Sequence, residues 1–152
     1  NNNKKILPTL KSRCINFNLF LTYNDSINII NNMLQDDIHN IINRELIDTY
    51  ITPGKLFKII NFSQENDIDI KNINLNDFLL KIIHKKLYKK DNTKDNFFYS
   101  FIQLYFRNKI SIKNYDAQNV YNYFLKKIHN TKIYNLDEEI LFMEFEDKII
   151  NG

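Results

Sequence analysis

A single arginine near the start of the chain is the residue whose type and setting could do chemistry. Residues 6–14 read ILPTLKSRC, so Arg13 follows a turn formed around Pro8 and Thr9. An arginine side chain carries a planar, permanently charged fork of donors that suits bidentate contact with phosphate oxygens. Held at the edge of a domain, it can reach across a subunit boundary to a nucleotide bound by a neighbour. An arginine close to a lysine is also an ordinary surface feature, so residue type alone leaves both interpretations open.

The other groups that could do chemistry favour plainer interpretations. The histidines lack the spacing of metal ligands, and we expect no metal site; they are His39, His84 and His129. Residues 84–90 (HKKLYKK) could contact DNA phosphates. They stand at the end of an expected helix, where cations complement the helix dipole, and we expect a solvated surface there. A second exposed face, with no paired acid and base, is expected from the acidic residues Glu138, Glu139, Glu144, Glu146 and Asp147.

The composition is that of a globular helical protein. Of the 152 residues, 43% are hydrophobic and 26% charged, while Gly and Pro number only two each, which argues against a fold with many tight turns. The net charge of +3 is mild for a dedicated nucleic-acid binder. One cysteine, Cys14, excludes an internal disulfide and fits a reducing compartment, so we expect a cytoplasmic protein. No apolar run approaches the ~20 residues that span a bilayer, and we expect no membrane contact.

Apolar residues at helical spacing predict an all-α fold in two parts. The first part has helices over about 23–35, from about 36 or 37 to 47, and from Pro53 to about 62. The second has helices over about 75–89, 94–109, 115–129 and 136–150. Thr22 with Asp25 has the pattern of a capping box, and so has Asn135 with Glu138. The segment 66–74 breaks the apolar pattern and predicts a linker.

Three short motifs, in order along the chain, resemble those of one family. LPTLKSRC (7–14) is similar to the LPT-[IL]-[RK]-SRC stretch of clamp-loader subunits, the AAA+ ATPase-family proteins that open the sliding clamp of the replicative polymerase. TPGKL (52–56) is similar to the SPGRAL element that opens the third helix of the lid in that family. NLDEE (135–139) looks like the NLDRK-type stretch near the C-terminus of bacterial delta prime subunits, alphaproteobacterial ones in particular.

The resemblance implies a domain order and a role for named residues. Residues 1–14 would end the nucleotide-binding core, 15–65 would form a three-helix lid, 66–74 a linker, and 75–152 a collar of four or five helices that assembles subunits into a ring. Arg13, within Ser12-Arg13-Cys14, would be an arginine finger for the ATP site of the adjacent subunit. Pro53, Gly54 and Lys55 would be the lid motif. The chain begins NNNKK without an initiator Met, and we expect it to be a piece of a longer protein.

The implied function is that of a delta prime subunit in the clamp loader of DNA polymerase III. Its partners would be the gamma/tau and delta subunits, and the sliding clamp and primed DNA through the whole complex. The phosphate-binding loop GxxxxGK[ST] is absent, so we expect no cofactor and no catalysis by this chain alone. Lys55 stands where the family often has a nucleotide-sensing Arg, which favours delta prime over an ATP-hydrolysing motor subunit. A motor subunit of gamma/tau type and an unrelated helical interaction module remain the alternatives.

Overall fold

The described part of the protein is entirely helical. The computed structural model describes residues 13, 21–49, 51–90, 97–110 and 115–151. Within these ranges there is no strand, and the all-α prediction is confirmed. The α-helices are α2 (Tyr23–Leu34), α3 (Ile38–Ile41), α4 (Pro53–Glu65), α5 (Leu75–His84), α6 (Phe98–Ile110), α7 (Tyr115–Tyr134) and α8 (Glu138–Asn151); the short 3-10 helices are η2 (Arg44–Leu46) and η3 (Leu87–Lys90).

The first helix begins where the sequence predicts. The Thr22 side chain accepts a hydrogen bond from the Asp25 backbone N–H (3.2 Å), and the Asp25 carboxylate accepts one from the Thr22 backbone N–H (3.0 Å). This reciprocal pair is a capping box, which satisfies donors that a helix start would otherwise leave unpaired. The predicted capping box at residues 22–25 is therefore confirmed.

The second expected helix is broken into α3 and η2. Asp37 caps α3 by accepting from the His39 backbone N–H (3.0 Å), and Asn43 caps η2 by accepting from the Glu45 backbone N–H (3.0 Å). Ile42, between them, is extended. The apolar stripe that suggested one helix is still buried, so the pattern located the core face. It could not show that a capping asparagine interrupts the helix.

The non-helical segment 66–74 is held against the first helices. Asp67 ends α4 with a left-handed backbone (φ 50°), and Ile68 and Ile70 behind it are buried. The Ile70 carbonyl accepts from the Asn43 backbone N–H (2.8 Å). The Leu75 backbone N–H, at the start of α5, donates a hydrogen bond to the Glu45 carboxylate (3.2 Å). This bond connects α5 to η2. The segment leads from α4 to α5, and its role as a linker between two domains stays a prediction.

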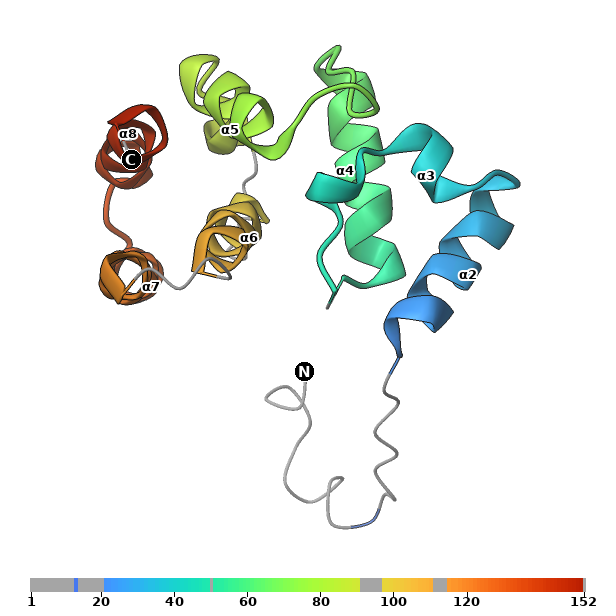
Figure 1. Cartoon of the computed structure of the whole chain (residues 1–152), viewed down its shortest axis with the longest axis horizontal. Helices are drawn as coiled ribbons and strands as arrows, with labels where there is room; N and C mark the ends of the chain where they lie inside the picture. The colour runs from blue at the N-terminus through green and yellow to red at the C-terminus, as the bar shows by residue number, and fades with distance from the viewer. Residues whose placement is uncertain (1–12, 14–20, 50, 91–96, 111–114, 152) are drawn as a thin grey trace.

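Helix α6 lies between α7 and α4 and below α5 in the view of Figure 1. Its aromatic side chains point to several neighbours and are buried. Phe101 packs edge-on against Phe78 of α5, with ring centroids 5.0 Å apart, and Phe106 packs against Phe124 of α7 and Phe145 of α8 at 5.2 and 5.6 Å. The aromatic residues of this helix thus fill the protein's own core.

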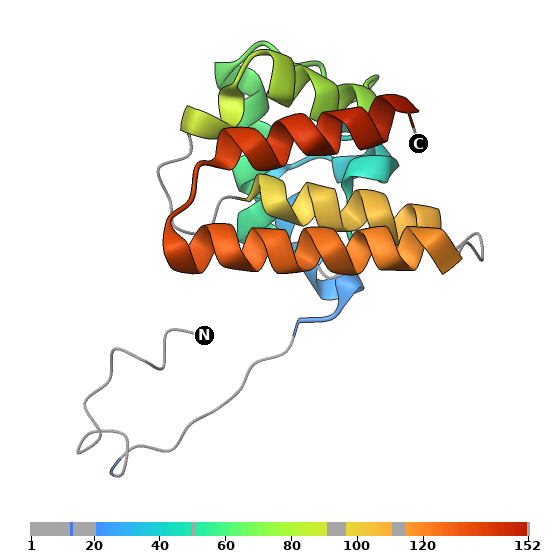
Figure 2. The ribbon, with the colours of Figure 1, turned by 90° about the vertical axis from the view of Figure 1, so that its left-hand side faces the viewer.

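Helices α7 and α8 run antiparallel, joined by a short turn (Figure 2). The prediction that Asn135 caps the last helix is wrong. Asn135 has a left-handed backbone (φ 51°) and ends α7, and the next backbone N–H donates back to the Thr131 carbonyl (3.2 Å). Asp137 is the cap, since its carboxylate accepts from the Glu139 backbone N–H (2.9 Å). Both residues suit helix ends, and the sequence alone placed the boundary two residues early.

Phe62 of α4 joins the first three helices to the last four. Its ring packs edge-on against Phe97 and Phe98 at the start of α6, with centroids 5.5 and 4.9 Å apart. A second link is the ion pair of Asp48 with Arg107 of α6. Because the buried apolar side chains form one continuous cluster across this junction, the two groups of helices share a core.

We expect Phe62→Ala to lower the free energy of unfolding by about 3–5 kcal/mol, because it leaves a cavity against α6. Phe57→Ala is the matched control on the same helix, since Phe57 is 40% exposed and Phe62 only 9%. It should cost about 1 kcal/mol or less. Urea denaturation followed by circular dichroism measures both. Equal losses for the two variants would show that the Phe62 ring does not join the helix groups.

Candidate functional site

Of the arginine-finger motif, Arg13 is the member that the structure describes. Its side chain is exposed and its backbone lies in a turn. The other four residues singled out in this motif lie outside the described residues: Pro8, Thr9, Ser12 and Cys14. An exposed guanidinium is free to contact a partner, which is the condition the predicted role requires. The role itself stays a prediction.

The predicted lid motif forms the start of α4. Thr52 is the N-cap and accepts a hydrogen bond from the Lys55 backbone N–H (3.4 Å), while Pro53 occupies the first turn, where its missing N–H costs nothing. Gly54 does not have a positive φ, and a Cβ added there would meet nothing within 4 Å. Among the residues that the structure describes there is therefore no steric reason for a glycine at position 54.

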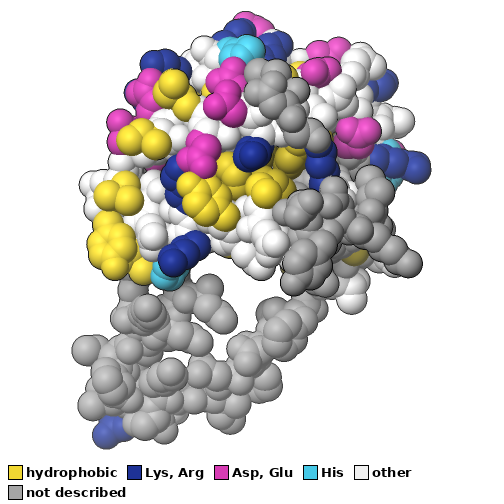
Figure 3. All heavy atoms as spheres, turned by 60° about the vertical axis from the view of Figure 1, so that its left-hand side comes forward, with side chains coloured by type: hydrophobic (Ala, Val, Ile, Leu, Met, Phe, Trp, Pro, Cys, Tyr) yellow, Lys and Arg dark blue, Asp and Glu magenta, His cyan; other side chains and the backbone are white. Residues whose placement is uncertain are grey.

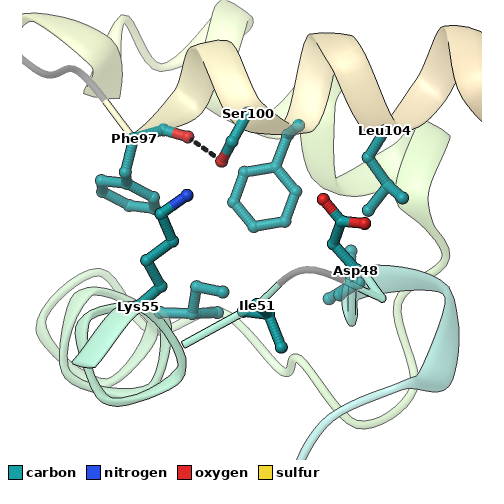
Figure 4. Close-up of a pocket in the computed structure, with 9 residues that line it drawn as sticks. Asp48, Ile51, Lys55, Phe97, Ser100 and Leu104 are labelled. Atoms are coloured by element: carbon teal, nitrogen blue, oxygen red, sulfur yellow. Dashed lines mark hydrogen bonds between the residues drawn. The ribbon is translucent and has the colours of Figure 1, made fainter. Parts of the chain in front are cut away.

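Lys55 is exposed and extends from α4 toward Phe97, at the rim of a small cavity between α4 and α6 (Figure 4). The cavity has a volume of about 20 Å³. This is room for about one water molecule, so it cannot hold a nucleotide. Arg13 is not among the residues that line it, which are Leu46, Asp48, Ile51, Lys55, Ile59, Phe97, Ser100, Phe101 and Leu104.

The basic residues 84–90 and the acidic residues of α8, expected to be two separate solvated faces, pair with each other. Lys86 and Lys89 both bind the Glu139 carboxylate, at 2.5 and 2.6 Å. The Nε2 atom of His84 lies 2.6 Å from Glu146. We call these five residues the α8 charged contacts. Since the side chains of both glutamates are only about a quarter exposed, the expectation of an exposed acidic face is wrong for them.

The α8 charged contacts shift the ionisation of their members. Hydrogen bonds from Lys86 and Lys89 lower the pKa of Glu139 to about 2. The hydrogen bond from Lys89 to Glu139 in turn raises the pKa of that lysine. A phosphate group would have to compete with Glu139 for both ammonium groups, so the pairing weakens the DNA-binding interpretation of residues 84–90.

Two further glutamates fix α8 to its neighbours. Glu138 accepts a hydrogen bond from the Tyr99 hydroxyl of α6 (2.6 Å), and Glu144 pairs with Lys127 of α7. Burial, and then the hydrogen bond to Glu138, raise the pKa of Tyr99, which stays protonated as the donor. For the α8 charged contacts the sequence did carry a signal, since the basic residues 84–90 and the acidic residues of α8 are runs of opposite charge that can pair.

Nothing in the described ranges forms a metal centre, because no three His, Cys, Asp or Glu side chains there are grouped as ligands. Nor does any helix of the described residues combine the length and apolar character needed to cross a bilayer. The described charged groups instead hold helices together, as the contacts of α8 with residues 84–90 and with α7 show.

Comparisons of the chain with protein-family models, with curated proteins and with solved structures found no match. The resemblance to clamp-loader subunits rests on the three short motifs.

We expect acidification to weaken the attachment of α8 through Glu139. The pKa of its carboxylate in the folded protein, about 2, lies below its ordinary value of 4.5. The stabilisation from its two lysines is therefore complete above pH 4.5 and is lost as the pH falls toward 2. Glu139→Gln should remove this part of the pH dependence, measured as the urea midpoint across that range. Glu65→Gln, at the exposed end of α4, is the control; the same change in both variants would contradict the assignment.

We expect Gly54→Ala to stabilise the isolated chain by up to about 1 kcal/mol, because alanine restricts the unfolded chain and fits the helix start without a clash. Thermal unfolding should shift upward by about 2–4 °C. A loss of stability would mean that a contact within the chain does require glycine at this position.

Proposed function

We propose that the chain is the C-terminal part of a clamp-loader subunit, of the delta prime type, from a bacterial DNA polymerase III that acts in the cytoplasm. Its helices α2–α4 would be the lid and α5–α8 the collar. The subunit would not hydrolyse ATP through this chain. It would hold the ring of gamma/tau and delta subunits together and support the loading of the sliding clamp onto primed DNA.

The observation that carries the proposal is the position of the second motif relative to the first. LPTLKSRC precedes the helices, as it does where the family's nucleotide-binding core ends. TPGKL opens the third helix of the family's lid, and in this chain it opens α4, the third of the described α-helices. The four helices α5–α8 that follow form a bundle of the size expected for a collar. Motif order and helix order thus support the same interpretation.

One detail of the lid motif agrees with a non-hydrolysing subunit. Lys55 carries a charge but lacks the bidentate fork of an arginine, so it is a weaker sensor of a nucleotide phosphate. This favours the delta prime type over a gamma/tau-type motor subunit, whereas Gly54, which meets no steric constraint among the described residues, does not distinguish the two.

In the proposed complex, Arg13 would act on the neighbour's ATP. Its guanidinium would neutralise charge that develops on the γ-phosphate during hydrolysis, and this would couple hydrolysis to closure of the clamp. The role belongs to the longer protein in its ring, because the nucleotide and the attacking water are held by the adjacent subunit.

The first test is co-elution in size-exclusion chromatography. The chain, shown by circular dichroism to be helical, would be mixed with purified gamma/tau and delta subunits from the same source. A stable complex is expected because the collar residues lie within the chain. A folded chain that elutes alone at micromolar concentration would count against the collar assignment and favour an unrelated helical interaction module.

The second test is Arg13→Ala in the longer protein, assembled with its partners. We expect clamp-stimulated ATP hydrolysis at the neighbouring site to fall by about 10³-fold, the effect of removing an arginine finger, while the complex still assembles. Arg13→Lys should restore little, since lysine lacks the fork. Arg44→Ala, a change at an exposed arginine of η2, is the control. Undiminished hydrolysis in the Arg13→Ala complex would refute the role.

A further inference from the structure

A cluster of exposed hydrophobic side chains lies on α7, α8 and the turn between them. Six of the ten exposed large hydrophobics in the described residues belong to it, each 51–68% exposed. Figure 3 shows hydrophobic side chains gathered along the edge of this side of the molecule. We call this surface the α7–α8 apolar face; its members are Tyr123, Ile133, Tyr134, Leu136, Ile140 and Met143.

The face is larger than the structure of this chain needs. Helix α8 turns Phe142 and Phe145 into the core and leaves Ile140 and Met143 outside. If each of the six residues has a surface of about 200 Å², of which 51–68% is exposed, they expose roughly 700 Å² together. This lies just above the usual size of the largest apolar patch on a monomer and approaches the ~800 Å² per partner of a standard interface. A surface of this size favours burial in an association.

Opposite charges stand toward the end of the face that is far from the turn, where Tyr123 also lies. On α7, Lys126 lies seven residues before Ile133 and so shares its side of the helix. On α8, Asp147 lies seven residues after Ile140 and shares that side of its helix. Both charged side chains are exposed. The face is thus apolar at one end and carries a cation on one helix and an anion on the other.

We infer that a second copy of this chain covers the α7–α8 apolar face, with a two-fold axis that runs between α7 and α8 and parallel to them. This symmetry places α7 of each copy on α8 of the other, and it brings the apolar ends together. The inference stands apart from the proposed function, since it concerns contact between identical chains and does not require a clamp loader.

The contact between α7 and α8 within one chain supports the pairing of charges. Lys127 pairs with Glu144, so in these antiparallel helices Lys126 lies level with residue 145. Asp147 is two residues further, or about 3 Å along the axis. Rotation about an axis parallel to the helices keeps every residue at its level. Lys126 of each copy therefore meets Asp147 of the other, and the same surface is complementary to itself in both hydrophobicity and charge.

The experiment is sedimentation equilibrium of the chain from about 1 µM to about 1 mM, the range of dissociation constants for weak and moderate association. We expect a monomer–dimer equilibrium. Met143→Lys should weaken it by about tenfold or more, because it places a charge within the apolar contact. Met33→Lys on α2 is the matched control, since both methionines are 60% exposed and Met33 lies outside the face; it should leave the equilibrium unchanged.

A charge exchange tests the two-fold arrangement itself. Asp147→Lys should weaken the dimer about tenfold, because Lys126 of the other copy then faces a like charge. The double variant Lys126→Asp with Asp147→Lys restores both pairs of opposite charges and should recover most of the affinity. Higher salt should reduce the difference between the single and double variants.

Three results would overturn the inference. The first is a chain that stays monomeric at every concentration. If such a monomer binds a clamp-loader subunit through Met143, the inference of a dimer fails while the proposed function stands. The second is an equal weakening of the dimer by Met33→Lys and by Met143→Lys, which would indicate non-specific association. The third is a double charge variant that associates no better than Asp147→Lys alone.

Discussion

The burial of α6 on several sides is the constraint on which the rest of the structure depends. A helix at the surface has one apolar stripe, whereas α6 offers aromatic rings to α4, α5, α7 and α8. Aromatic pairs add specific edge-on geometry to the area that they bury. The neighbours are therefore placed by where the rings of α6 point, and Phe62 extends the same packing to the first three helices.

Ion pairs and hydrogen bonds to carboxylates add to the aromatic packing in holding the helices together, above all on α8. A carboxylate that loses much of its water on folding needs a partner, or burial costs free energy. Glu138, Glu139, Glu144 and Glu146 each have one, supplied by α6, by residues 84–90 and by α7. Exposed ion pairs add little stability. Their main effect is to fix the register of α8, because a shift along its axis would separate several pairs at once.

The sequence predicted the helices well where apolar spacing and local caps decide the outcome, as at Thr22 and Pro53. It failed where two local structures compete. Asn43 and Asn135 suit a helix start, a helix end or a break, and tertiary contacts select among these. It also failed for long-range charge pairing, because the residues that meet are some fifty positions apart. For the candidate site, the sequence supplied Arg13 and the lid motif. Only the structure shows that the cavity at Lys55 is small and that no described residue requires a glycine at position 54.

The sequence of α8 also explains why its outer face is the part of the fold that invites a partner. Residues 140–143 are four consecutive apolar residues, and a helix that packs on one side of a bundle can bury only about half of them. The core takes Leu141 and Phe142, and the helix cannot rotate to bury the others without exposing these two. Ile140 and Met143 are therefore exposed by the same interactions that stabilise the monomer. Their burial requires another molecule, and the opposite charges of Lys126 and Asp147 beside them favour a second copy of this chain.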